Sequence, residues 1–255
     1  TNWRTDLDLH NPGTTQASYS IALLKHAADN SSPDGLPVTV LPGQAVRYTD
    51  AVYDLFSFSG KAALRVEATS GSLVATSRTY NDQPSGTYGQ FVPASPDGEA
   101  ITSDREGRLI QLSHQPNAGS GGFRTNIGVV NAGSASIAVT IDLYASTGAY
   151  LGQVPMSLRA YEYQQIDKVF ERVTASAVAG GYAVVRTSTT GGRFFTYASA
   201  IDNRTGDPVF VPAANLPRGS APPTPTPTPT TTPGVVTGPG GTSITLPSGG
   251  TTPNT

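Results

Sequence analysis

WRTDLDLHNPG at residues 3–13 and FRTNIGVVNAG at residues 123–133 are two versions of one strand and turn, 120 residues apart. Each begins with an aromatic residue followed by Arg and Thr, continues with apolar residues at every second position, and ends in an Asn-x-Gly turn. An alternation of period two is typical of a strand that buries one face. The chain is therefore predicted to carry one β-structured unit twice.

The repeat continues over nearly the whole of both copies. In the next predicted strand, four alternating apolar residues keep the offset of 120, namely Ala17, Tyr19, Ile21 and Leu23 against Ile137, Val139, Ile141 and Leu143. Residues 50–53 align with residues 167–170 at an offset of 117, and residues 62–65 with residues 183–186 at 121. Both copies close on the string FVPA, and small insertions in loops account for the changing offset.

Short alternating runs between Gly, Pro, Asn and Asp turns are typical of β-sandwiches, because each strand buries one face and exposes the other. We therefore expect an all-β fold with two tandem immunoglobulin-like β-sandwich domains, residues 1–96 and 97–217. One helical turn is expected after Asp50 and another after Asp167, with each Asp as the N-cap.

Composition argues against several classes of function. Only 13% of residues are charged and the formal net charge is −2, so the chain lacks the basic surface that nucleic acids or anionic membranes attract. No apolar run approaches the roughly 18 residues of a membrane-spanning helix. Without Cys, the chain forms no disulfide and no thiolate metal site.

No residues form a recognisable catalytic or cofactor site. The histidines, His10, His26 and His114, follow no metal-ligand spacing, and none has a nearby Ser or Cys nucleophile together with a suitable orienting acid. The oxygen-rich loop at residues 202–207 fits no calcium motif and indicates an Asx turn. Trp3 is interpreted as a core or edge anchor rather than a sugar platform. The sequence predicts a protein that is not an enzyme and binds no metal or cofactor.

Four longer strings strengthen the assignment: WRTDLDLHNPG, SRTYNDQPSGTYGQFVPA, FRTNIGVVN and AIDNRTGDPVFVPA. Together they resemble a tandem β-sandwich repeat of large extracellular proteins of environmental bacteria, over about residues 1–215. The resemblance implies the fold and an extracellular or cell-surface location, and no chemistry.

The two copies differ where they begin. The alternating run GRLIQLSH at residues 107–114 precedes Phe123 and is predicted to be the leading strand of the second sandwich, whereas no such strand precedes Trp3. The first sandwich is therefore expected to have an open edge with unpaired backbone groups. The strand expected to accept a partner there is the one that contains Trp3, Thr5, Leu7 and Leu9.

The end of the chain offers a strand that could fill this edge. Residues 218–234 are rich in Pro and Thr and should form an extended spacer. At about 3.1 Å per residue, the roughly 15 residues of the Pro-Thr repeat at 219–233 could reach about 45 Å. Residues 235–255 follow as a tail with no expected local partner. The tail contains a short β-prone run, and the apolar residues that would form a donor strand are Val235, Val236, Ile244 and Leu246.

These features predict a structural subunit of an extracellular bacterial filament or surface assembly, in which the tail of one molecule inserts into the first sandwich of the next molecule. The mechanism is analogous to donor-strand assembly of pili, and the expected partners are copies of the same chain. Glycans are expected on the extended spacer, at Thr224, Thr226, Thr228 and Thr230.

The Asn30 and Asn203 sequons are weaker candidates for glycans. The alternative function is a cell-surface adhesion or carbohydrate-binding module tethered by the Pro/Thr linker. An exposed aromatic row, including Tyr80 and Tyr88, would favour that alternative. Nothing specific supports a hydrolase.

Overall fold

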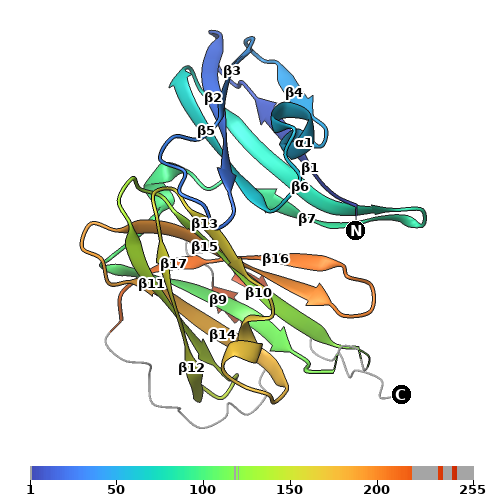
Figure 1. The fold of residues 1–255 in the computed structure, drawn as a ribbon, viewed down its shortest axis with the longest axis vertical. Helices are drawn as coiled ribbons and strands as arrows, with labels where there is room; N and C mark the ends of the chain where they lie inside the picture. Colours follow the sequence, from blue (N-terminus) through green and yellow to red (C-terminus); the bar gives the residue numbers. More distant parts are fainter. Residues whose placement is uncertain (1, 118, 120, 220–234, 238–242, 246–255) are drawn as a thin grey trace. The chain divides into compact units, whose positions relative to one another are not determined.

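The computed structural model describes residues 2–117, 119, 121–219, 235–237 and 243–245. It divides into two compact units, residues 1–221 and residues 222–255. The described part is all-β, built from several antiparallel sheets with a few short helical turns (Figure 1).

The first copy forms two sheets. Its elements are β1 (Trp3–His10), β2 (Ala17–Lys25), β3 (Gly35–Val40), β4 (Ala45–Tyr48), α1 (Ala51–Phe56), β5 (Ala62–Ser70), β6 (Val74–Gln83) and β7 (Gly86–Pro93). One sheet has the strand order β4-β1-β6-β7 and the other has the order β3-β2-β5. The core lies between the two sheets, around Leu9, Tyr19 and Ile21.

The second copy repeats this plan with three additional strands. Its elements are η1 (Asp97–Glu99), β8 (Ile101–Thr102), β9 (Arg105–His114), β10 (Phe123–Asn131), β11 (Ile137–Tyr144), β12 (Tyr150–Leu158), β13 (Tyr163–Ile166), η3 (Val169–Arg172), β14 (Val178–Thr187), β15 (Arg193–Asp202), β16 (Pro208–Pro212) and β17 (Ala214–Pro217). One sheet has the order β13-β10-β15-β16, with β8 beside β15, and the other has the order β12-β11-β14-β9-β17.

Strand pairing shows which elements of the two copies correspond. The strands β1 to β7 take the places of β10 to β16, in the same order, and α1 takes the place of η3. Ala22 pairs with Arg65 where Asp142 pairs with Val184, so β5 and β14 correspond at an offset of 119. The predicted offset of 121 is wrong, because it matched similar letters across loops of different length.

The predicted offset of 117 for the helical turns is wrong by one residue. Leu7 pairs with Tyr48 where Ile127 pairs with Ile166, which gives 118. The left-handed residue before the turn is therefore Asp50 in the first copy and Lys168 in the second.

Both helical turns form where the sequence predicts them, but neither has an Asp side chain as its cap. Asp50 has φ 46°, and its side chain makes no capping hydrogen bond. An N-cap normally has extended backbone, which directs its side chain back to the first turn. In its place, Asp6 Oδ1 accepts a hydrogen bond from the Asp50 backbone N–H at 3.1 Å, and Asn126 Oδ1 accepts one from Lys168 at 2.9 Å.

The Asn-x-Gly turn of the repeat is held by one fully buried Asn in each copy. Asn131 Nδ2 donates to the carbonyl oxygens of Ala135 at 2.8 Å and Arg159 at 2.6 Å, and its Oδ1 accepts from the Gly133 N–H at 2.9 Å. Asn11 makes the equivalent contacts in the first copy. One side chain therefore ties the turn to a neighbouring loop, which explains why the motif occurs in both copies.

We expect Asn131→Ala to destabilise the protein by about 2–4 kcal/mol, because three part-buried backbone groups lose the fully buried side chain that pairs with them, and an unsatisfied group costs up to about 1–3 kcal/mol. Urea unfolding followed by circular dichroism measures this loss. Asn2→Ala, at an exposed position, is the control and should change stability by less than about 0.5 kcal/mol. Equal effects of both substitutions would show that the turn is not a stabilising element.

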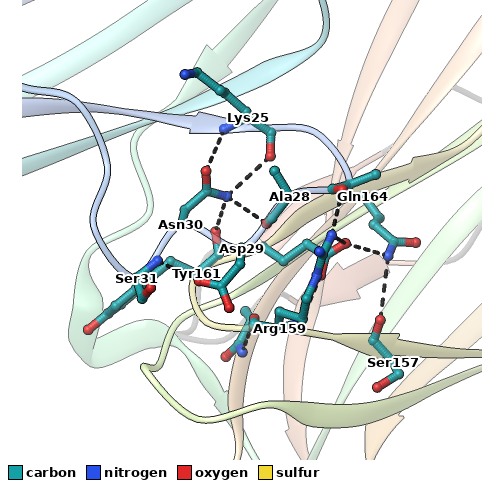
Figure 2. Close-up of polar contacts among 12 residues, drawn as sticks. Lys25, Ala28, Asp29, Asn30, Ser31, Ser157, Arg159, Tyr161 and Gln164 are labelled. Atoms are coloured by element: carbon teal, nitrogen blue, oxygen red, sulfur yellow. Dashed lines mark hydrogen bonds and ion pairs between the residues drawn. The ribbon is translucent and has the colours of Figure 1, made fainter.

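A loop of the first copy is hydrogen-bonded to a loop of the second (Figure 2). Asn30 Nδ2 donates to the carbonyl oxygens of Lys25 at 3.1 Å, Ala28 at 3.0 Å and Tyr161 at 3.1 Å, and its Oδ1 accepts from the Lys25 N–H. Arg159 Nη2 donates to the Ala27 carbonyl oxygen at 2.5 Å. The two copies are thus joined by direct contacts within one compact unit.

The described part of the tail is a short hairpin. β18 (Val235–Thr237) and β19 (Ser243–Thr245) are antiparallel, with Val235 opposite Thr245 and Val236 opposite Ile244. The prediction that this segment has no local partner is therefore wrong, because the two halves of the run pair with each other. Leu246 lies outside the described residues, as do the four spacer Thr residues.

Candidate functional site

The leading strand predicted for the second copy is present as β9, and it completes that core. β9 pairs with β14 on one side and with β17 on the other. Leu109 and Leu112 project from it into the core and are fully buried. Gln111, with φ 60°, interrupts the alternation between them, in a stretch where the pairing with β14 is irregular. The strand therefore contributes both backbone pairing and apolar side chains.

The first copy has no equivalent of β9 among the described residues. β5, which corresponds to β14, pairs with β2 and with no other described strand, so it is the edge of its sheet (Figure 1). An unpaired edge presents free N–H and C=O groups to an incoming strand. The open edge that the sequence predicted is thus present, at a different strand.

The predicted acceptor, Trp3, Thr5, Leu7 and Leu9, is the wrong strand. β1 lies inside its sheet, paired with β6 along its whole length and with β4 over residues 7–10. Leu7 and Leu9 are buried in the core between the sheets. The leading strand is adjacent to β10 in sequence but pairs with β14 in space, so its missing counterpart would lie beside β5.

Matched positions show that the core of the first copy is open where that of the second is closed. Leu64 and Val66 on β5 are half-buried, whereas their counterparts Ala183 and Val185 are fully buried. Leu73 is also half-buried, and its counterpart Phe194 is fully buried. This difference in burial is expected, because the described part of the first copy has no side chains that correspond to Leu109 and Leu112 of β9.

A groove of about 2400 Å³ is lined by residues of both copies, among them Tyr161, Tyr163 and Phe210 of the second, and it extends over this side of the first copy. In the first copy, its lining includes inward side chains of β5, Leu73 just before β6, and residues of β6 and β7, among them Leu64, Val66, Ala75 and Val92. In the second copy, β9 packs against β16 as well as β14. The part of the groove between β5 and β7 therefore corresponds to the space that β9 fills.

Two charged residues stand on β5 beside the open edge, on the face away from the core. Arg65 Nη2 lies 3.5 Å from Glu67 Oε2, and the Arg65 guanidinium lies 4.5 Å from the ring centroid of Tyr161. The Arg65 Nε is buried and has no hydrogen-bond partner. Sequence reasoning missed both residues, because it did not identify β5 as the edge.

The corresponding face of the second copy carries an ion cluster centred on Glu106, a β9 residue that is only 1% exposed. Its carboxylate accepts from Arg108 Nε at 2.7 Å and from Arg186 Nε at 2.9 Å. Burial alone would raise the pKa of Glu106, but these hydrogen bonds outweigh burial and hold the pKa below its usual value. Burial raises the pKa of Asp142, although Arg186 Nη1 lies 2.6 Å away.

Tyr80 and Tyr88 do not form the exposed aromatic row that would favour a carbohydrate-binding module. Tyr80 is buried and its hydroxyl lies 3.2 Å from Asp6 Oδ1, and Tyr88 is half-buried. Trp3 and Phe123 are 44% and 43% exposed, so neither is a core anchor.

The remaining candidates are structural. Asn30 is buried and its amide makes the contacts of the junction, which leaves no room for a glycan. Asp202 Oδ1 accepts from the N–H groups of Arg204 and Thr205, which confirms the Asx turn. The three histidines lie apart on different strands and loops, and the described residues contain no group of three side chains arranged to hold a metal. No helix within the described ranges is long and apolar enough to cross a membrane.

Comparison with protein-family models, with curated protein sequences and with solved structures gives no match for this chain.

Proposed function

We propose that this protein is a structural subunit of an extracellular filament or surface assembly, in which a strand from the tail of one molecule occupies the edge at β5 of the next molecule. The observation that carries the proposal is the contrast between half-buried Leu64 and Val66 and their fully buried counterparts Ala183 and Val185. Under the proposal, each molecule has two tandem immunoglobulin-like sandwiches, and the first of them is completed by a strand from a neighbouring molecule.

The tail provides side chains that suit the groove. In an extended strand, Ile244 and Leu246 point to one face, and Leu64 and Val66 alternate in the same way on β5. Burying each such side chain contributes about 1.5–3 kcal/mol. The backbone of the incoming strand would also pair with the free edge.

The hairpin of β18 and β19 does not prevent this exchange. An isolated two-stranded hairpin is at best marginally stable in water, so little free energy opposes its opening. The Pro/Thr spacer before it supplies the reach to another molecule. Each molecule both gives a strand and receives one, through different surfaces. Contacts of this kind do not form a closed dimer, so they build chains of subunits.

We expect a full-length chain with Ile244→Asp and Leu246→Asp to remain monomeric under conditions in which the unaltered chain polymerises, because two carboxylates cannot enter an apolar groove. Sedimentation velocity and negative-stain electron microscopy measure the outcome. The matched control is Thr251→Asp with Thr252→Asp, which adds the same charge outside the strand and should assemble normally. Filaments formed by the first variant would rule out the tail as the donor.

A further inference from the structure

The pairing of β9 with β14 places complementary groups beside each other on the outer face of the second copy. Val184 lies opposite Arg108, and Arg186 contacts Glu106 through an ion pair of 2.9 Å. Glu106 is almost fully buried there, so its partner on β14 is essential to this arrangement.

The corresponding positions of β5 carry different groups. Arg65 pairs with Ala22 as Val184 pairs with Asp142, so Arg65 takes the place of Val184. A cation therefore stands where the second copy has an apolar side chain. A strand of the β9 type would bring Arg108 next to this cation.

At the second outward position of β5, the charge is opposite to the charge at the matched position of β14. Glu67 pairs with Ser20 as Arg186 pairs with Thr140, so Glu67 takes the place of Arg186. A strand of the β9 type would bring Glu106 next to Glu67. Both outward positions would then place like charges opposite each other, which is destabilising in a sheet.

We propose that the edge at β5 selects its partner strand by charge. It excludes strands of the β9 type, and its occupant is the uncharged tail strand of another molecule, residues 235–247. The inference rests on the proposed function, since it names the chemistry of the strand that enters the same edge. This charge selection prevents the β9 strand of another molecule from occupying the groove.

Two observations support this selection. The buried Nε of Arg65 has no hydrogen-bond partner and would donate to an oxygen of the incoming strand. Residues 235–247 contain no charged side chain, and with Ile244 and Leu246 facing the groove, the hydroxyl of Thr245 would face the same side as Arg65.

The test measures peptide binding to the full-length Ile244→Asp, Leu246→Asp chain, whose own tail cannot fill the groove. One peptide has the sequence of residues 105–114, and a second exchanges its charges through Glu106→Arg and Arg108→Glu. A third has the sequence of residues 235–247. We expect the charge-exchanged peptide to bind at least about tenfold more tightly than the native 105–114 peptide, and the difference to shrink in 1 M salt.

The matched receptor gives β5 the outward residues of β14, through Arg65→Val and Glu67→Arg. These positions point away from the core, so the fold should be retained, and circular dichroism checks this. We expect this receptor to reverse the preference and bind the native 105–114 peptide more tightly. Affinities within about twofold for both peptides, or a preference that Arg65→Val with Glu67→Arg does not reverse, would overturn the charge selection.

The same measurements separate the two proposals. If the charge preference holds but the 235–247 peptide does not bind, the edge is charge-selective and the tail is not its donor. If the 235–247 peptide binds and no charge preference exists, the tail assembly stands and the selection fails. If no peptide binds, the edge accepts no strand and both proposals are wrong.

Discussion

Val185→Asp is expected to unfold the second sandwich, whereas Val66→Asp at the matched position of the first should be tolerated. Val185 is fully buried in the core on β14, beside β9, so a carboxylate there is cut off from water and costs about 5 kcal/mol or more. Val66 is half-buried and lines an open groove, where water can solvate the carboxylate, and the cost should be about 1–2 kcal/mol. Urea unfolding followed by far-ultraviolet circular dichroism measures both changes.

Trp3, the only Trp, lies in β1 and reports the first sandwich separately through its fluorescence. In Val66→Asp, the fluorescence transition should stay near its original midpoint while assembly is lost, because the charge blocks the incoming strand. If Val66→Asp were as destabilising as Val185→Asp, the groove would not be open to solvent. If Val66→Asp still assembled, the inward face of β5 would not be the binding surface.

Glu106→Gln is expected to destabilise the second sandwich by about 3 kcal/mol, because Arg186 and Arg108 lose the charge that compensates them in a largely buried setting. Denaturant unfolding at neutral pH measures the loss. Glu171→Ala is the control: its ion pair with Lys168 is at the surface, and its removal should cost less than about 1 kcal/mol. Similar losses in both variants would show that the Glu106 cluster is not a special stabilising element.

The same residue makes stability depend on pH. The folded-state pKa of Glu106 is lower than its unfolded value of about 4.5, so the unfolded chain binds the proton more readily. The stabilisation is present above that value and is lost as pH falls through the folded pKa. Asp142, whose pKa is raised, changes stability in the opposite direction and offsets part of the effect. The loss of stability on acidification should therefore be smaller in Glu106→Gln than in the unaltered chain.

Local patterns in the sequence predicted much of this fold. The alternation at Leu7 and Leu9 and its repetition at Ile127 and Val129 mark β1 and β10, and the Asn-x-Gly turn marks their ends. The run at residues 107–114 also forms the expected strand. These features are predictable because each depends on residues close together in the chain.

The position of the open edge could not be predicted in the same way. β9 precedes β10 in the sequence, yet it pairs with β14, and no local pattern specifies a partner so far along the chain. The prediction of the helix caps failed for a related reason. The side chains that hold the helical turns are Asp6 on β1 and Asn126 on β10, each distant in sequence from the turn that it holds. Only a comparison of the two copies indicates the edge. The run at residues 107–114 of the second copy has no counterpart among the described residues of the first.

Crosslinking between two differently labelled chains tests most directly whether the tail strand of one molecule occupies the edge at β5 of another. The chain has no Cys, so Glu67→Cys in one chain and Thr245→Cys in the other introduce single thiols. The two are mixed unfolded, assembled together and treated with a short bismaleimide. Thr39→Cys on β3, at the opposite edge of the same sheet, replaces Glu67→Cys in the control. We predict a crosslinked heterodimer with Glu67→Cys and none with Thr39→Cys. No heterodimer with Glu67→Cys, or equal yields with both, would contradict strand exchange at β5.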